Sequence, residues 1–304
     1  MNNVFVAGGS GAIGIPLVRA LVAAGHHVTA LTRSRRRQDD LHALGASVAV
    51  ADALNRDALI AVVLATRPTH VIHQLTALPK DGPRKASDVD ATNRLRIDGT
   101  RNLLDAAIKS GARRFIAGSF ALASDRGPRS PIPADDPIAV AVRSMESQVL
   151  DASARGSIEG IVLRYGLFYG LETASTVKMI EMVRKHRLPV VRGDAGQLPL
   201  IHIDDAVSAT VAALDRGVPG GAYDIVDDRA VSMTELVEGL AQSTGSAKPF
   251  RVPAWLPRLV SPYLARMTSL RMPLSNATAK SALGWKPAYP TLRDGLAQMF
   301  HQAA

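Results

Sequence analysis

Short runs of apolar and β-branched residues alternate with longer amphipathic stretches over the first two-thirds of the chain. The short runs predict strands at residues 3–7, 27–32, 47–51, 70–75, 114–117 and 160–163. The longer stretches predict helices near residues 13–24, 38–44, 56–66, 89–110 and 138–153. Strands that alternate with helix-length segments form right-handed βαβ units. The pattern therefore predicts an α/β fold of the Rossmann type, with a doubly wound parallel sheet and ligands at the carboxyl ends of its strands.

The alternation weakens after Arg164, and glycine, proline and arginine cluster between residues 184 and 197. We expect residues 1–164 to form the Rossmann-type domain, and residues 165–198 and 227–304 to form a smaller C-terminal lobe that would bind the substrate. Residues 199–226 are expected to return to the first domain, with 207–214 and 222–226 joining the main sheet.

Composition and charge narrow the class of protein. The 304 residues contain 36 Lys and Arg against 27 Asp and Glu, which gives a net charge of +9 that attracts phosphates. The chain has no cysteine, which excludes disulfides, zinc–thiolate sites, iron–sulfur clusters and a cysteine nucleophile. No cluster has metal-ligand spacing, and an aromatic content of 4% argues against nucleic-acid binding. Apolar stretches such as 58–66 are too short for a membrane span, and the N-terminus lacks signal-peptide features, so we expect a cytoplasmic protein.

A glycine-rich segment follows the first predicted strand and opens the first predicted helix. Glycines there permit a tight turn and close approach of the backbone to a pyrophosphate, and the helix N-terminus supplies N–H donors. A bare glycine pattern is weak evidence, but this position between strand and helix makes it specific. The segment predicted to bind the pyrophosphate consists of Gly8, Gly9, Ser10, Gly11, Ala12, Ile13 and Gly14.

The end of the second predicted strand indicates the cofactor. NAD-binding folds usually place an acid there, to bind the ribose hydroxyls. This chain has Thr32 followed by Arg33, whose guanidinium can pair with a 2′-phosphate. We therefore predict NADP(H), with Thr32 and Arg33 in contact with it. The next arginines, 35–37, are expected to include part of a solvated basic turn.

Further motifs resemble the extended short-chain dehydrogenase/reductase superfamily, in particular its NAD-dependent epimerase/dehydratase family. The resemblance covers nearly the whole chain, and its motifs include residues 99–104 (GTRNLL), 163–170 (LRYGLFYG), 201–206 (IHIDDA) and 283–287 (LGWKP). Asp52 matches the family's adenine-contacting aspartate, and residues 71–77 resemble the loop that flanks the cofactor. The resemblance implies further cofactor contacts from Asp52, Ala53, Leu75, Thr76, Ala77 and Arg96.

The family's catalytic set is a serine or threonine, a tyrosine and a lysine. Ser119 aligns with the serine, although a structural role at a strand end is nearly as plausible by sequence. The Tyr-x-x-x-Lys motif is missing, because Ile138 and Val142 align with the tyrosine and the lysine. Neither side chain can transfer a proton. Ser119 and Tyr169 are therefore the candidate catalytic residues, in a substrate pocket that the loop after Leu75 also lines.

Two classes of function fit these features. The first is an NADPH-dependent reductase of a small or medium organic substrate with a C=N, C=C or C=O bond, working without the Tyr/Lys acid. The alternative is a non-redox NADP(H)-binding protein, either a cyclase or isomerase or a sensor. A nucleotide-sugar epimerase or dehydratase is disfavoured, because those reactions depend on the tyrosine. The sequence leaves the oligomeric state open. The resemblance allows a homodimer, because the family often dimerises through two long helices, which would be 89–110 and 138–153 here.

Overall fold

A computed structural model describes residues 1–79, 82–83, 85–124, 132–194, 196–256, 259, 265 and 270–301. Its centre is a seven-stranded sheet in the order β10-β6-β5-β4-β1-β2-β3, with every neighbouring pair parallel. The strands are β1 (Asn3–Ala7), β2 (His27–Thr32), β3 (Ser47–Val50), β4 (His70–His73), β5 (Arg114–Phe120), β6 (Glu159–Tyr165) and β10 (Ala222–Ile225). The predicted Rossmann-type, doubly wound α/β fold is confirmed.

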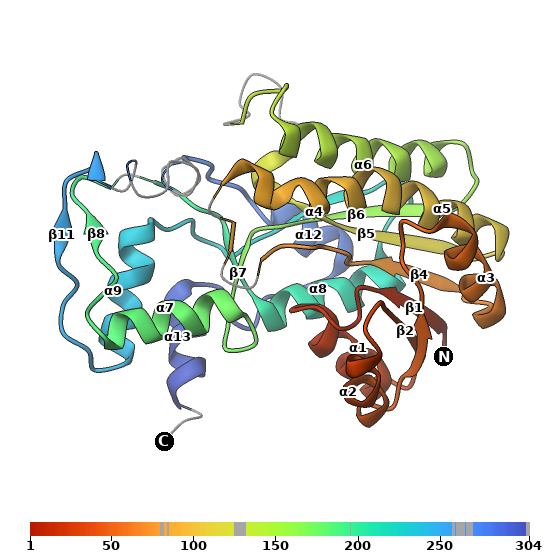
Figure 1. The fold of residues 1–304 in the computed structure, drawn as a ribbon, viewed down its shortest axis with the longest axis horizontal. Coiled ribbons are helices and arrows are strands. Elements are labelled where there is room, and N and C mark those ends of the chain that lie inside the picture. The colour runs from red at the N-terminus through yellow and green to blue at the C-terminus, as the bar shows by residue number, and fades with distance from the viewer. Residues whose placement is uncertain are drawn as a thin grey trace.

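Helices cover both faces of this sheet, as Figure 1 shows. One face packs against α1 (Gly14–Ala23), α8 (Ile203–Arg216) and α12 (Ala277–Leu283). The other packs against α3 (Arg56–Thr66), α5 (Thr100–Lys109) and α6 (Pro137–Ala154). Helix α2 (Gln38–Ala43) precedes β3, and short 3-10 turns occupy Arg35–Arg37, Ala86–Val89 and Ala121–Ala123. Because helices bury both faces of the sheet, its strands consist of nearly continuous apolar residues.

The long helix expected at 89–110 is divided into three parts. They are α4 (Asp90–Arg94), a π-helical turn (Leu95–Gly99) and α5. A π-turn inserts one extra residue into the helix, and such turns often occur at functional sites. Apolar periodicity predicted the helix but could not reveal this local change, which rotates the side chains around Arg96.

The C-terminal lobe has its own apolar core around Leu236 and Leu240 and lies on the left in Figure 1. Its elements are β7 (Leu167–Tyr169), α7 (Ala174–Arg184), β8 (Val190–Val191), β9 (Leu200–His202), α9 (Met233–Ser243), β11 (Arg251–Val252) and α13 (Leu292–His301), with β7 paired to β9 and β8 to β11. The expectation that 207–214 joins the sheet was wrong: those residues lie in α8, whose buried side chains cover the sheet instead. No helix in the described ranges is long and apolar enough to cross a membrane.

Candidate functional site

The turn between β1 and α1 depends on glycines that the fold itself requires. Gly8 has a φ of +89°, and a Cβ there would lie 2.6 Å from the carbonyl oxygen of Gln74. A Cβ on Gly9 or Gly14 would also overlap neighbouring atoms. Gly11 differs, because it is exposed and its Cβ would meet only the carbonyl oxygen of Gly8, at 3.2 Å. The open surface at Gly11 therefore suits the approach of an external group.

The N-terminus of α1 has the properties of an anion site. Its N-cap, Ile13, makes no side-chain cap hydrogen bond, and the first turn holds no acidic residue. Ala12 before it is exposed. The Ser10 hydroxyl lies 3.3 Å from the Thr32 hydroxyl, which holds the end of β2 against the loop. Uncapped N–H groups and the helix dipole favour a phosphate at this position.

The ends of β2 and β3 carry the residues expected to contact the adenosine half of a cofactor. Thr32 is buried, and its hydroxyl accepts the backbone N–H of Ser34 at 3.2 Å. Arg33, the next residue, is exposed. Asp52 is exposed and accepts a backbone N–H two residues on, while the carbonyl of Ala53 accepts from an asparagine of α5. These residues lie at the carboxyl ends of adjacent strands, as a bound dinucleotide would need.

The loop after β4 is tied to the helices beside it. The backbone N–H of Leu75 donates to Nδ1 of His73 at 3.2 Å, and that of Ala77 donates to the hydroxyl of Thr92 at 2.9 Å. Thr76 between them is exposed. The loop thus has a fixed shape at the edge where the nicotinamide half is expected.

Ser119 points into the protein rather than toward a substrate. It is 6% exposed, and its hydroxyl donates to Oε1 of Glu146 at 2.6 Å. The Ser124 hydroxyl donates to the same oxygen at 2.9 Å, and Arg164 forks onto both carboxylate oxygens at 2.6–3.1 Å. Because its proton is already donated to Glu146, Ser119 fixes α6 against β5 and β6. The structure thus gives Ser119 a structural role, and its catalytic role stays a prediction.

Tyr169 lies in the core of the C-terminal lobe. It is 1% exposed, its hydroxyl donates to Oδ2 of Asp227 at 3.0 Å, and its ring stands edge-on to His202 at 5.1 Å. Burial and then the charge of Asp227 raise the pKa of Tyr169 above its usual range. The hydroxyls of Tyr169 and Ser119 donate to different carboxylates, Asp227 and Glu146, and the role of Tyr169 as a proton source stays a prediction. The motif at residues 163–170 predicted that Tyr169 lies near the substrate pocket, but only the packing of the C-terminal lobe shows where its hydroxyl points.

Helix α6 contains neither tyrosine nor lysine. Ile138 is 4% exposed and Val142 is fully buried. Both belong to an apolar group that we call the α6 cluster, which consists of Val89, Leu122, Ala123, Ile132, Ile138, Ala139, Val142 and Met272. Phe120, at the end of β5, is partly buried against this cluster. An apolar wall thus occupies the place where the resemblance implies an acid and an amine.

The guanidinium of Arg96 lies over the Phe120 ring, 5.9 Å from its centroid. Arg96 is partly buried, and its Nη1 donates to Oδ1 of Asn93 at 3.3 Å. Neither Phe120 nor Asn93 was predicted from the sequence. Phe120 directly follows Ser119 in the sequence, which was a usable signal, whereas no motif pointed to Asn93, which lies in α4.

The buried carboxyl group beside Tyr169 predicts a pH effect on stability. Burial, opposed by the hydrogen bond from Tyr169, raises the pKa of Asp227 from 3.8 to about 7. Between about pH 4 and 7 the unfolded chain loses this proton first, so the stability contributed by Asp227 falls as the pH rises through that window.

We expect Asp227→Asn to remove this dependence. Relative to the wild type, the free energy of unfolding of the variant should rise by about 1.4 kcal/mol per pH unit between pH 5 and 7. Urea unfolding at each pH measures this difference. Asp228→Asn is the matched control, because burial there is outweighed by hydrogen bonds from Lys280 and Asn276, which lower the pKa of Asp228. Parallel stability curves for wild type and Asp227→Asn would contradict the prediction.

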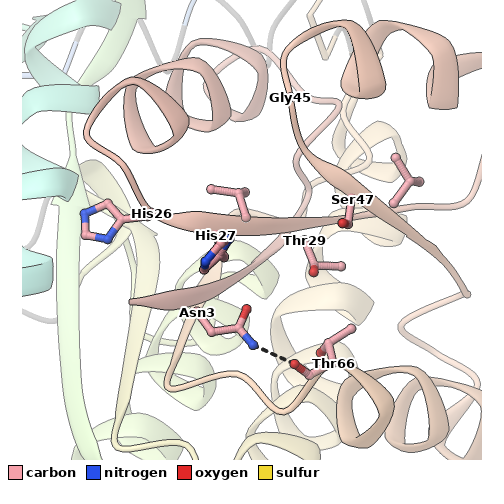
Figure 2. A pocket seen from close by; sticks show the side chains of 9 residues that line it. Asn3, His26, His27, Thr29, Gly45, Ser47 and Thr66 are labelled. Carbon is pink, nitrogen blue, oxygen red and sulfur yellow. Dashed lines mark hydrogen bonds between the residues drawn. The ribbon is translucent and has the colours of Figure 1, made fainter. Parts of the chain in front are cut away.

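A separate hollow of about 410 Å³ lies at the amino ends of β1, β2 and β3, the edge opposite the glycine loop (Figure 2). Its lining includes His26, His27 and Ser47, and the side chain of Asn3 donates to the carbonyl of Thr66 beneath it. Ligands of parallel α/β sheets bind at the carboxyl ends of the strands, so this hollow lies at the wrong edge for the cofactor.

Across the described residues, no group of three or more His, Asp or Glu side chains is placed to hold a metal ion.

Comparisons with known proteins agree with this geometry. The model of the NAD dependent epimerase/dehydratase family matches residues 4–226. The 3-diazoavenalumate denitrifying reductase of a Streptomyces sp is 38% identical over 309 residues, covering 97% of this chain and 99% of that protein. The 2-alkyl-3-oxoalkanoate reductase of Stenotrophomonas maltophilia (strain K279a) is 25% identical, and the match covers 81% of this chain and 77% of that protein. The solved UDP-glucose 4-epimerase of Thermus thermophilus, in complex with NAD, has a TM-score of 0.78 and 22% identity over 99% of each chain, which shows a shared fold.

Proposed function

Because this chain belongs to the NAD dependent epimerase/dehydratase family, we propose that it is an NADPH-dependent reductase whose substrate needs no proton from the protein. The observation that carries this proposal is the apolar wall of Ile138 and Val142, together with the inward hydroxyl of Ser119. A ketone accepts a hydride only as a proton reaches its oxygen. None of these three groups can donate that proton outward.

A cationic nitrogen electrophile fits such a site, because it takes up a hydride without a proton. When bound, the reduced nicotinamide supplies the hydride. On an arenediazonium ion, the new C–H bond replaces the C–N bond, dinitrogen leaves with the C–N electron pair, and NADP⁺ is the oxidised product. The Streptomyces relative is named as a denitrifying reductase of a diazo compound, which supports this choice. An iminium ion is the second acceptor of this class.

This chain's residues would orient the two reactants. The uncapped N-terminus of α1 and the open surface at Gly11 suit the pyrophosphate, and the loop around Thr76 borders the nicotinamide half. Phe120 offers an aromatic surface beside the apolar α6 cluster, which excludes water from the acceptor carbon. A cytoplasmic location is part of the same proposal.

The test is NADPH oxidation, followed by absorbance, with benzenediazonium, a stable iminium salt and a simple 3-oxo acid. We expect turnover with the cationic acceptors and none with the 3-oxo acid. With NADPH deuterated at C4, the arene product should carry deuterium. A Gly8→Val protein, which cannot form the loop, controls for the uncatalysed reaction. Reduction of the 3-oxo acid at a comparable rate would reject the proposal.

Arg33 is proposed to select NADPH over NADH. Arg33→Ala should weaken NADPH binding by roughly 1–3 kcal/mol, the scale of a charged hydrogen bond, and leave NADH binding almost unchanged. Calorimetric titration of both cofactors measures this. Arg37→Ala is the matched control, because the Arg37 guanidinium already lies 3.7 Å from Asp40. Equal losses for the two cofactors would contradict the assignment.

A further inference from the structure

We propose that Arg96 and Asn93 together bind a carboxylate of the substrate, so that the enzyme reduces aromatic or conjugated acids. This inference rests on the proposed function and names the substrate class at the same site. Its starting point is the pair of donors beside Phe120, at the carboxyl end of β5.

Asn93 supplies the first observation. It is 7% exposed, and its Oδ1 accepts a hydrogen bond from Arg96, which identifies the other amide atom, Nδ2, as the donor. Nδ2 is buried and has no hydrogen-bond acceptor among the described residues. A buried amide donor without a partner costs about 1–3 kcal/mol. An anionic oxygen beside Arg96 would remove that cost and accept a charged hydrogen bond as well.

The surroundings of Arg96 supply the second observation. Its neighbour His73 is not a competing cation, because burial and then the charge of Arg96 lower the pKa of His73 to about 4. Both nitrogens of that ring are already engaged, one with the Leu75 N–H and the other with the Thr100 hydroxyl. The Arg96 guanidinium therefore provides the positive charge beside Phe120, and it is only partly buried.

The sheet order excludes the cofactor's phosphates as the anion. The phosphate loop follows β1, and the adenosine half extends from there toward β2 and β3. Arg96 lies beside Phe120 at the end of β5, which is separated from β1 by β4. The nicotinamide half of the cofactor, which would reach this side, carries no anionic group beyond the pyrophosphate. Of the two bound reactants, the substrate is therefore the one that can bring an anion to Arg96.

The chemistry of the neighbouring side chains indicates what carries the carboxylate. Phe120 is partly buried against the α6 cluster, which includes Ile138, Val142 and Met272, and the Arg96 guanidinium lies over its ring. A conjugated body would contact this apolar surface while its carboxylate faces Arg96 and Asn93. A neutral or sugar-like substrate would bring no anionic oxygen to the buried amide of Asn93.

The binding test uses protein loaded with NADP⁺ and two unreactive probes, benzoate and benzamide, in calorimetric titrations. The wild type should bind benzoate at least tenfold more tightly than benzamide. Arg96→Gln should remove this preference, and Arg96→Lys should restore part of it. Arg94→Gln is the matched control, since Arg94 is on the same helical segment and its side chain is 69% exposed beside Asp98. Asn93→Asp keeps Arg96 but replaces the amide donor, so it should also weaken the binding of benzoate.

The kinetic test compares 4-carboxybenzenediazonium with benzenediazonium. Arg96→Gln should raise KM at least tenfold for the first and less than twofold for the second, with the Kd of NADPH within twofold of wild type. The inference would be overturned if the wild type bound benzoate no more tightly than benzamide. It would also be overturned if Arg96→Gln weakened the binding of NADPH rather than that of the carboxylate. If neither diazonium is reduced but benzoate binding depends on Arg96, the hydride chemistry is wrong and the carboxylate site stands.

Discussion

A lysine at position 142 is expected to cost the protein at least about 4 kcal/mol of folding free energy, because it buries an unpaired charge. Val142 is fully buried in the α6 cluster, between residues such as Leu122, Ile138 and Met272. Urea unfolding of Val142→Lys measures the loss. Val140→Lys is the matched control on the same helix: Val140 is 41% exposed, so the change there should be within about 0.5 kcal/mol.

The same substitution tests the proposed mechanism. Ile138→Tyr combined with Val142→Lys recreates the family's pair in sequence, yet it should not raise kcat with the native acceptor. The reason is that the new groups would enter an apolar wall rather than a prepared acid site. A stable double variant that gains ketone reductase activity would mean that the apolar wall can be turned into an acid site and that the family's usual mechanism is easily restored.

Loss of Glu146 should be nearly as damaging. Its carboxylate is 5% exposed and accepts from Ser119, Ser124 and the fork of Arg164. Glu146→Ala leaves the Arg164 guanidinium without this carboxylate and the Ser119 hydroxyl without its acceptor, and breaking such a buried pair costs about 3–5 kcal/mol. Activity should fall with stability, because this network fixes α6 against the ends of β5 and β6.

Two comparisons identify the cause of that loss. Glu146→Met with Arg164→Met should be more stable than Glu146→Ala, because no charge remains uncompensated. Glu181→Ala removes an exposed carboxylate that pairs with Lys178 and Lys185, and it should leave the unfolding midpoint unchanged. A Glu146→Ala protein as stable as the wild type would show that the network is dispensable.

The sheet and the glycine turn after β1 follow from local sequence alone. The apolar runs predicted β1 and β2 with their observed bounds, and the amphipathic pattern placed α3 at residues 56–66. Local physics is sufficient there, since an apolar run buried on both faces has few alternatives and a glycine turn is read directly from residue type. The absence of tyrosine and lysine from α6 is likewise evident from the residue types.

Which side chains meet depends instead on tertiary packing. Ser119 and Tyr169 occupy family motifs, yet one hydroxyl donates to Glu146 and the other to Asp227, because partners far along the chain fix where each points. Asn93 carried no signal in the sequence. Arg96 belongs to the π-helical turn and lies over Phe120, and such a one-residue insertion leaves the apolar period almost unchanged. Periodicity reports which face of an element is buried, whereas the contacts that perform chemistry depend on how the elements pack.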